Sequence, residues 1–321
     1  MHGDAAAGTA RMAGLDEVVA YRDLLTVGKC DVDPATHRDY RVALWKSSGE
    51  ETLEGLIGLD ELRQRLAHHE GDVAVWTTPT WSERCFTWHT IDQLTRLGVD
   101  RGRIWLSEPR SSRGRFSTGA FPHEELREAW ERRFPLEEAY ASDACALWVR
   151  YTDPQPLAFD EARRAGVASF PDLTECGAGH AAWFPWRREG HLFLSYGDQL
   201  LFDCLDIEWP AKPGWSSMLR APRGKELANV LWSWFGDVTT LDRLEAWRER
   251  GAIERRDNEV PDRPWIYSLR LTPLGQRLRD EGVERIDQLP PTYVGGCLVN
   301  DPNRPWVRER VGDGWRLVGQ P

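Results

Sequence analysis

Short apolar runs alternate with amphipathic stretches over the first 110 residues. Three of these runs have the length and composition of buried strands: Val18–Tyr21, Val73–Trp76 and Ile104–Leu106. Four other segments have helical spacing: 5–13, 39–48, 59–69 and 87–98. Strands that alternate with helices indicate a parallel sheet covered on both faces. We therefore expect an α/β fold, with a Rossmann-like three-layer domain and a small parallel sheet over residues 1–120.

The pattern changes in the second half of the chain. Residues 121–190 are predicted to form a helical connector, with helices over 123–133, 137–150 and 157–165. Further on, two helices (225–235 and 240–250), two strands (252–256 and 265–271) and a helix that begins at Thr272-Pro273 follow one another in winged-helix order. This order predicts a mainly helical C-terminal domain of winged-helix type over residues 191–321.

Composition narrows the class of protein. Hydrophobic residues make up 41% of the chain and charged residues 29%, which is enough apolar material for a packed core. No apolar run approaches the roughly 20 residues that span a bilayer, and the start Met1-His2-Gly3-Asp4 does not resemble a signal peptide. We expect a cytoplasmic protein without a membrane partner. The six cysteines form no Cys-x-x-Cys pair, so buried thiols are expected rather than a metal site.

Charge bears on the choice of partner. The formal net charge of −10 argues against a free-standing DNA-binding protein, because phosphate contacts require a basic surface. The predicted recognition helix carries three acids and three bases: Asp242, Arg243, Glu245, Arg248, Glu249 and Arg250. DNA is therefore a disfavoured partner, although the sequence leaves open whether a local basic patch exists. It also leaves open whether the protein forms a homodimer.

A first polar constellation follows two predicted strand ends: His2, Gly3, Asp4, Arg11, Arg22, Asp23, Thr26 and Gly28. Asp4 and Asp23 would face one crevice, since ligands of such sheets bind beyond the carboxyl ends of the strands. A helix beginning beside Gly3 favours an anion, which Arg11 and Arg22 could clamp. Asp23 would act as a general base or bind a ribose hydroxyl. Residue by residue, an N-cap role for Asp4 and a structural ion pair for Asp23 are favoured, but the group as a whole indicates a pocket.

A second constellation follows the strand that ends at Trp76: Thr77, Thr78, Thr80, Ser82, Glu83, Arg84, His89, Asp92 and Gln93. His89 and Asp92 lie three residues apart on a predicted helix and share a face, as an acid–base pair would. Asp92 and Gln93 would line the wall opposite the first constellation. A surface interaction between His89 and Asp92 is the favoured alternative, and no second His or Cys stands at metal-ligand spacing.

The beginning of the sequence is unusual. His2-Gly3-Asp4 has the character of a strand end, although almost nothing precedes it. Either the first strand is missing, or translation starts upstream of Met1, which is the hypothesis we favour. Mass spectrometry of the native N-terminus tests it.

Several of these motifs resemble an uncharacterised bacterial family, domain of unknown function 1835. The matching residues are His2, Gly3, Asp4, Ala7, Gly8 and Arg11, then Arg22, Asp23, Leu25, Thr26 and Gly28, then Asp92, Gln93 and Leu94. The C-terminal half is similar in the segment from Trp148 to Pro154 and in Gly295, Gly296 and Trp306. Ala5, Thr26 and Lys29 depart from the family pattern. The resemblance implies the fold and the place of a site, and no reaction.

Three functions remain open. The first is binding or turnover of a small anionic, perhaps nucleotide-like, metabolite, with Asp4, Asp23 and His89 as catalytic candidates. The second is a transcription regulator that senses a ligand and binds DNA through the winged helix. The third is an interaction module without catalysis, suggested by 17 tryptophans. No Gly-x-Gly-x-x-Gly fingerprint is present, so the cofactor stays unknown.

Overall fold

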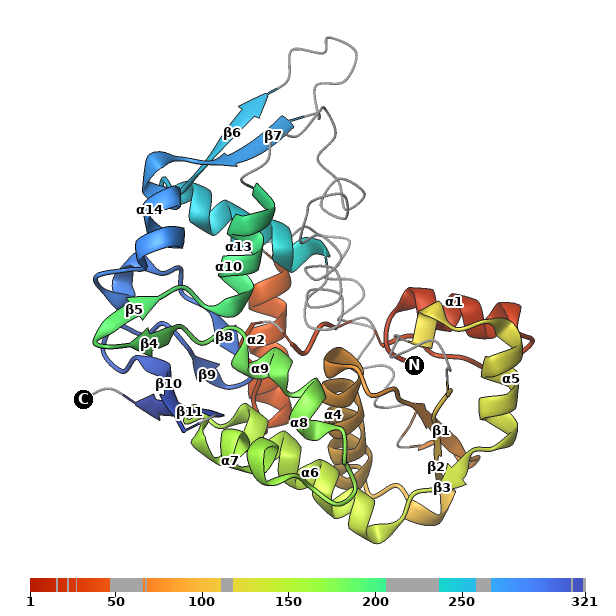
Figure 1. The fold of residues 1–321 in the computed structure, drawn as a ribbon. Coiled ribbons are helices and arrows are strands. Elements are labelled where there is room, and N and C mark those ends of the chain that lie inside the picture. The colour runs from red at the N-terminus through yellow and green to blue at the C-terminus, as the bar shows by residue number, and fades with distance from the viewer. Residues whose placement is uncertain are drawn as a thin grey trace. The chain divides into compact units, whose positions relative to one another are not determined.

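The structure is a computed structural model, and it describes ten parts of the chain: residues 1–15, 17–21, 23–26, 28–46, 66, 68–110, 118–205, 237–257, 267–312 and 314–319. The chain divides into two compact units (Figure 1). The first comprises Met1–Gly177 and Gly295–Cys297, and the second comprises Ala178–Val294 and Leu298–Pro321. Both contain helices and small sheets, so the expected mixed α/β class is confirmed.

The first unit is built around a three-stranded sheet. Its strands are β1 (Val73–Trp76), β2 (Ile104–Ser107) and β3 (Phe134–Pro135), in the order β1-β2-β3. β1 and β2 are parallel, with Val73 opposite Ile104 and Trp76 opposite Ser107, and β3 is antiparallel to β2. Among the described strands, β1 is therefore at the edge of this sheet.

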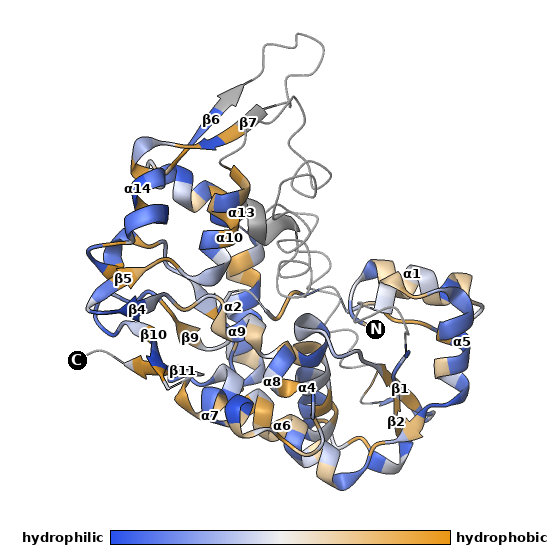
Figure 2. Cartoon of the chain, viewed as in Figure 1, coloured by the Kyte–Doolittle hydropathy of each residue, from blue (hydrophilic) through white to orange (hydrophobic). Residues whose placement is uncertain are grey.

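The described part of the first unit also contains seven α-helices and two 3-10 turns. They are α1 (Asp4–Met12), α2 (Pro34–Lys46), α4 (Trp81–Arg96), α5 (His123–Glu131), α6 (Glu138–Thr152), α7 (Leu157–Ala165) and α8 (Leu173–Cys176), with 3-10 turns η1 (Arg101–Arg103) and η2 (Thr118–Ala120). β1 and β2 are largely hydrophobic, whereas α5 is mostly hydrophilic and turns one apolar edge inward (Figure 2).

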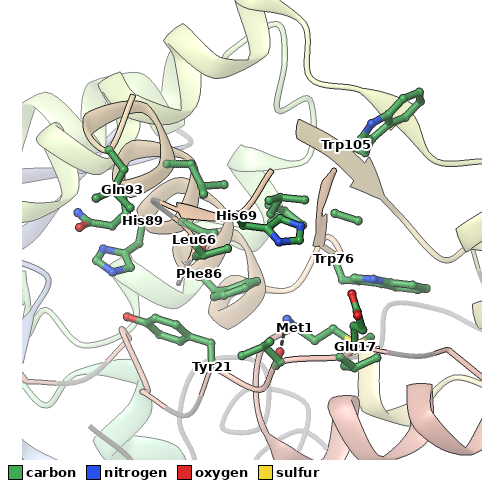
Figure 3. Close-up of a pocket in the computed structure, with 18 of the residues that line it drawn as sticks. Met1, Glu17, Tyr21, Leu66, His69, Trp76, Phe86, His89, Gln93 and Trp105 are labelled. Atoms are coloured by element: carbon green, nitrogen blue, oxygen red, sulfur yellow. Dashed lines mark hydrogen bonds between the residues drawn. The ribbon is translucent and has the colours of Figure 1, made fainter. Parts of the chain in front are cut away.

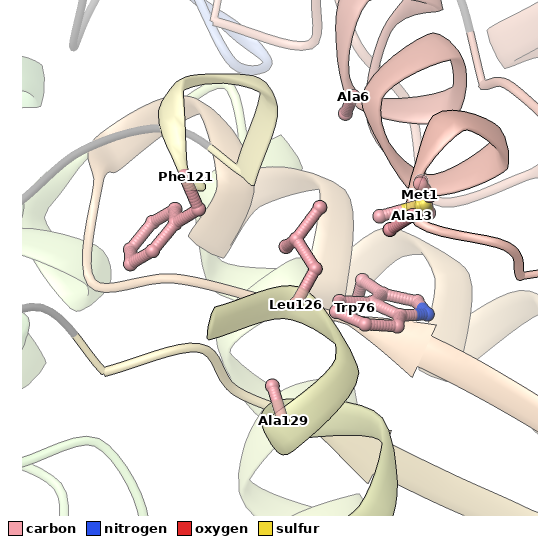
Figure 4. Packing of buried hydrophobic residues seen from close by; sticks show 8 residues of the cluster. Met1, Ala6, Ala13, Trp76, Phe121, Leu126 and Ala129 are labelled. Atoms are coloured by element: carbon pink, nitrogen blue, oxygen red, sulfur yellow. The ribbon is translucent and has the colours of Figure 1, made fainter. Parts of the chain in front are cut away.

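Two apolar clusters hold the first unit together. Aromatic rings pack edge-to-face or tilted between α4, α6 and α7: Trp81, Trp88, Tyr151 and Phe159. The second cluster joins α1, α5 and the end of β1 (Figure 4), and its members are Met1, Ala6, Ala10, Ala13, Trp76, Phe121, Leu126 and Ala129. Small alanines on α1 let this helix approach Trp76 and α5 closely.

The second unit has a four-stranded sheet of order β11-β10-β4-β5. Its strands are β4 (Trp186–Arg188), β5 (His191–Phe193), β10 (Trp306–Val311) and β11 (Gly314–Gly319). β10 runs parallel to β4, and the other pairs are antiparallel. The remaining elements are α9 (Ala178–Ala181), α10 (Tyr196–Leu205), α13 (Asp237–Glu249), the hairpin β6 (Ile253–Asp257) and β7 (Tyr267–Leu271), α14 (Pro273–Glu281) and η3 (Ile286–Gln288). The short pair β8 (Tyr293–Val294) and β9 (Cys297–Leu298) lies at the junction of the two units in the sequence.

Several expectations need correction. Val18–Tyr21 forms no full strand: among the described residues only Met1–Gly3 pair with it, and Tyr21 makes one isolated parallel bridge to His2. α4 begins at Trp81, six residues before the predicted helix over 87–98, so the polar residues 81–85 belong to this helix. His191–Phe193 forms a strand, which the predicted winged-helix order did not include. The expected helices over 59–69 and 225–235 lie mostly or wholly outside the described residues.

Candidate functional site

The N-terminus of α1 lies next to the bridge between His2 and Tyr21. Gly3 is the N-cap, at φ 86° and ψ 156°, a backbone conformation that is almost restricted to glycine. Asp4, which we expected to be the cap, stands instead in the exposed first turn of the helix. Among the described residues, no side chain at the N-cap accepts a hydrogen bond from the first turn of α1. The space beside Gly3 is open, since a Cβ built on it would meet no atom within 4 Å. Asp4 and Ala5 are exposed at this end of α1, whereas Ala6 is buried and η2 packs over its backbone N–H, so that a Cβ on Gly119 would lie 3.0 Å from it.

Arg11 does not reach this end of the helix. It lies in the last turn of α1 and donates to the carbonyl oxygen of Val18 at 2.7 Å. Seven residues of helical rise separate Arg11 from Asp4 by about 10 Å. The structure therefore separates Arg11 from the expected anion clamp, and Arg22 lies outside the described residues.

Asp23 is fully buried in an ion pair. Its carboxylate accepts hydrogen bonds from Arg41 Nε and from Trp45 Nε1, each at 2.9 Å, and His37 lies 3.9 Å away. Burial raises the pKa of Asp23, but the charge and hydrogen bonds of Arg41 outweigh this effect and hold the pKa below its usual value. A carboxylate bound in this way is a weak general base, since its proton affinity is low and its lone pairs are occupied.

Thr26 and Gly28 lie in the loop that follows Asp23. Thr26 is 1% exposed, and its Oγ1 has no hydrogen-bond partner in the described structure. Gly28 has φ 70°, and a Cβ there would lie 2.5 Å from Cδ2 of Leu44. Gly28 is thus explained by close packing on α2, whereas the Thr26 hydroxyl is an unused donor.

His2 connects the helix end to this loop. Its Nε2 donates to the carbonyl oxygen of Asp23 at 3.2 Å, and its ring stacks on Phe86. Burial lowers the pKa of His2 to about 4. The ring is therefore neutral at neutral pH and contributes hydrogen bonds rather than positive charge.

The second constellation is buried along α4. His89 packs between the rings of His37, Tyr21 and Trp148, with centroids 4.6–5.6 Å apart. Asp92 accepts a 2.6 Å hydrogen bond from Arg96, one turn further along the helix. Gln93 and His89 both line the cavity described below. His89 packs against His37, which lies beside Asp23, so His89 adjoins the buried ion pair of Asp23. Asp92 instead forms an ion pair with Arg96 on its own helix.

A further polar cluster lies where β1 and β2 end. Arg84 bonds Thr77 Oγ1 at 3.0 Å, Asp172 at 2.9 Å and Glu108 at 3.1 Å. Glu83 accepts two short hydrogen bonds from Thr118, and burial raises its pKa. Sequence reasoning noted Glu83 and Arg84 but missed their partners Glu108, Thr118 and Asp172. Because two carboxylates surround Arg84, this guanidinium offers little net attraction to an anion.

A cavity of about 1010 Å³ lies within the first unit (Figure 3). Met1, Glu17 and Tyr21 bound it on one side, and α4 bounds the other with Phe86, His89 and Gln93. β1 contributes all four of its residues to the lining. Most of the lining is apolar, so the cavity itself is not the expected anion site.

Three other expectations concern metals, DNA and membranes. In the ranges that the structure describes, no cluster of three or more His, Cys, Asp or Glu could hold a metal ion. Of the predicted recognition helix, Arg243 is buried against Asp198 and Arg248 pairs with Glu245, while Arg270 of β7 pairs with Glu254. Among the described helices, none is long and apolar enough to cross a membrane.

Comparison with known proteins adds no relative. No family model, curated protein or solved structure matches the chain.

Proposed function

We propose that the first unit binds a small anionic metabolite at the edge where β1, β2 and the His2–Tyr21 pair end. The observation that carries this proposal is Gly3. Its conformation begins α1 without a side-chain cap among the described residues, directly after an extended segment, with open space beside its α-carbon. An uncapped helix N-terminus presents backbone N–H groups and a partial positive charge, which together suit a phosphate or carboxylate.

The neighbouring side chains define what else the ligand would meet. Asp4, exposed in the first turn, would accept hydrogen bonds from a ligand hydroxyl or serve as an acid–base group. Neutral His2 would supply a ring nitrogen. η2 packs against α1, where Thr9 Oγ1 donates to the carbonyl oxygen of Gly119, so η2 borders the same place. Asp23 positions His2, because its carbonyl oxygen accepts the hydrogen bond from His2 Nε2.

The finer fold assignments support this placement and are proposals as well. We propose a Rossmann-like arrangement for the first unit, because β1 and β2 are parallel and α4 follows β1. We propose a winged-helix-like arrangement for α13, β6, β7 and α14, because the hairpin and the Thr272-capped helix follow α13 in that order. Membership of the family called domain of unknown function 1835 and a cytoplasmic location belong to the same proposal. DNA binding is not part of the proposal, since Arg243, Arg248 and Arg270 form ion pairs with acidic residues.

The test is a thermal-shift screen of the full chain against inorganic phosphate, sugar phosphates, nucleotides and small carboxylates. A ligand at about 100 times its dissociation constant adds roughly 2.7 kcal/mol to the free energy of unfolding, which is a shift of several degrees. Gly3→Ala should abolish this shift, because a Cβ forces the N-cap out of its conformation. The matched control is Gly14→Ala at the other end of α1, where φ is 81° and space is equally open.

Two results would refute the proposal. One is the absence of a shift with every anion in the screen. The other is an equal loss of the shift in Gly3→Ala and Gly14→Ala, which would trace the loss to general strain in α1.

A further inference from the structure

The four-stranded sheet of the second unit is basic, in contrast to the chain as a whole. The full chain has 41 Lys and Arg residues against 51 Asp and Glu. The strands β4, β5, β10 and β11 carry a single acid, Glu309, and five arginines, which are Arg187, Arg188, Arg308, Arg310 and Arg316. β4 and β10 are accordingly coloured as hydrophilic in Figure 2. This sheet therefore provides a local basic surface within a chain of net charge −10.

The register of the strands divides these charges unequally between the two faces of the sheet. Glu309 lies opposite Arg187 of β4 and opposite Arg316 of β11, and its carboxylate is 3.7 Å from Arg187 Nη1. Because side chains alternate between faces along a strand, the acid and these two arginines share one face. The other face has no acidic residue within the four strands. We call it the arginine face, and it carries Trp186, Arg188, Phe193, Arg308, Arg310 and Trp315.

Aromatic rings occupy the inner part of the arginine face. Trp186 stacks on Phe193 with ring centroids 4.2 Å apart, and Trp315 stands at 83° to Trp186. The guanidinium of Arg308 lies 5.2 Å from the centre of the Trp315 ring. All three rings are only partly buried. Apolar ring surface on this face is therefore accessible to a ligand.

Exposed arginines lie beside these rings. Following the register of β10 with β4, Arg310 comes next to Arg188 where β4 ends, and it lies opposite Trp315 of β11. Arg188 and Arg310 are both exposed. The Nε of Arg188 is 3.4 Å from Glu189 Oε1, but the two side chains are 69% and 80% exposed, so this ion pair is weak. Two solvated guanidiniums thus flank a partly exposed indole.

We propose that the arginine face binds single-stranded nucleic acid. Arg188, Arg308 and Arg310 would contact phosphates, and Trp315 would stack on a base. A single strand exposes both its phosphates and the faces of its bases, and proteins bind it through a basic surface combined with aromatic rings. A duplex hides its base faces in its own stack, so it would meet the arginines alone. The proposal concerns the second unit and does not depend on the anion site of the first.

This mode of binding predicts a specific dependence on salt. Each phosphate that a cation neutralises on a single strand contributes about −0.7 to the slope of log K against log salt concentration. Three arginines predict a slope of about −2, which weakens binding roughly 20-fold between about 50 and 200 mM salt. Loss of one base stack should weaken binding by at least about fivefold.

The experiment is a fluorescence-anisotropy titration of a labelled uridine strand of about twelve nucleotides with the full chain, repeated over this range of salt. The comparison ligands are a duplex of the same length and inorganic polyphosphate, an anion without bases. One double variant is Arg188→Gln with Arg310→Gln. Its matched control is Arg187→Gln with Arg316→Gln, which removes the same charge from the opposite face of the same sheet. Trp315→Leu tests the stack, and melting curves verify that every variant is folded.

The uridine strand should bind more tightly than the duplex or polyphosphate. The Arg188 and Arg310 double variant should bind at least about tenfold more weakly and reduce the salt slope to about −0.7, whereas the opposite-face control should change affinity by less than about twofold. Three results would overturn the proposal: no binding of the uridine strand at about 50 mM salt, binding of the duplex or polyphosphate that is at least as tight, or equal losses of affinity in the two double variants.

Discussion

Replacing Asp23 with Asn separates a structural from a catalytic role for this carboxylate. Asp23 is 0% exposed and accepts hydrogen bonds from Arg41 and Trp45, which lie one helical turn apart on α2. Asn keeps the shape but removes the negative charge, and Arg41 is then a buried cation without compensation. Removing one partner of a buried ion pair costs about 3–5 kcal/mol. For the first unit, of roughly 180 residues, this corresponds to a fall of about 6–20 °C in melting temperature.

The assay combines urea unfolding with hydrogen exchange by peptide. Exchange should accelerate first in peptides from α2 and from residues 23–30, because the ion pair fixes these two segments to each other. A double variant, Asp23→Leu with Arg41→Met, removes both charges and fills the space with apolar atoms. It should be clearly more stable than Asp23→Asn, with a coupling energy of at least about 2 kcal/mol.

The second unit provides a matched control. Asp198 accepts hydrogen bonds from Arg243 at 2.6 and 2.7 Å and from Trp247 at 2.8 Å, the same arrangement on a different helix. Asp198→Asn should therefore destabilise peptides of the second unit and leave α2 unchanged. If Asp23→Asn costs less than about 1 kcal/mol yet abolishes ligand binding, the structural interpretation is wrong and Asp23 is a functional group of the site.

Two other substitutions test the packing of the first unit. Glu83→Gln should stabilise the protein at pH 8 and lose this advantage near pH 4. Burial raises the pKa of Glu83, so its ionisation above a pH of about 4.5 favours the unfolded state, and Gln removes this effect. Melting curves across this pH range measure the difference, and a constant offset between the two proteins would contradict the prediction. Gly296→Ala should cost more than about 3 kcal/mol, because its Cβ would lie 1.8 Å from the Thr152 carbonyl oxygen; urea unfolding measures the cost, with Gly8→Ala on α1, where a Cβ meets nothing within 4 Å, as the control.

Local sequence signals predicted the elements whose stability is local. The strands at Val73 and Ile104 were predicted because each is a short apolar run, and the structure forms both. The helix after Thr272-Pro273 was predicted from its capping residues, and Thr272 Oγ1 does accept from the N–H of Gly275. Val18–Tyr21 has an equally apolar pattern but forms a single bridge, since a strand also requires a neighbour along its whole length.

Long-range partners could not be predicted in this way. Nothing next to Asp23 in the sequence identifies Arg41 as its partner, and Arg84 gave no sign of pairing with Asp172, 88 residues further on. The spacing Arg-x-x-x-Trp occurs at Arg41 and Arg243, where both residues bind one carboxylate from one helix face. It also occurs at Arg84, where Trp88 does not share the carboxylates of Arg84, so the spacing alone did not identify the ion pairs.

These partnerships decide which polar residues of the first unit remain for a ligand. Asp23 and Arg84 are buried and hydrogen-bonded by groups of opposite charge, so a ligand could engage them only by breaking an ion pair. Arg11 stabilises the turn after α1 from the wrong end of the helix. The backbone at Gly3, the hydroxyl of Thr26, which has no partner among the described residues, and the neutral ring of His2 carry no such cost. All three belong to the segments 1–3 and 23–26, which the His2–Asp23 hydrogen bond connects. The strongest candidate site therefore depends on backbone groups and neutral side chains, and it should bind an anion through N–H hydrogen bonds and the helix dipole rather than through an ion pair.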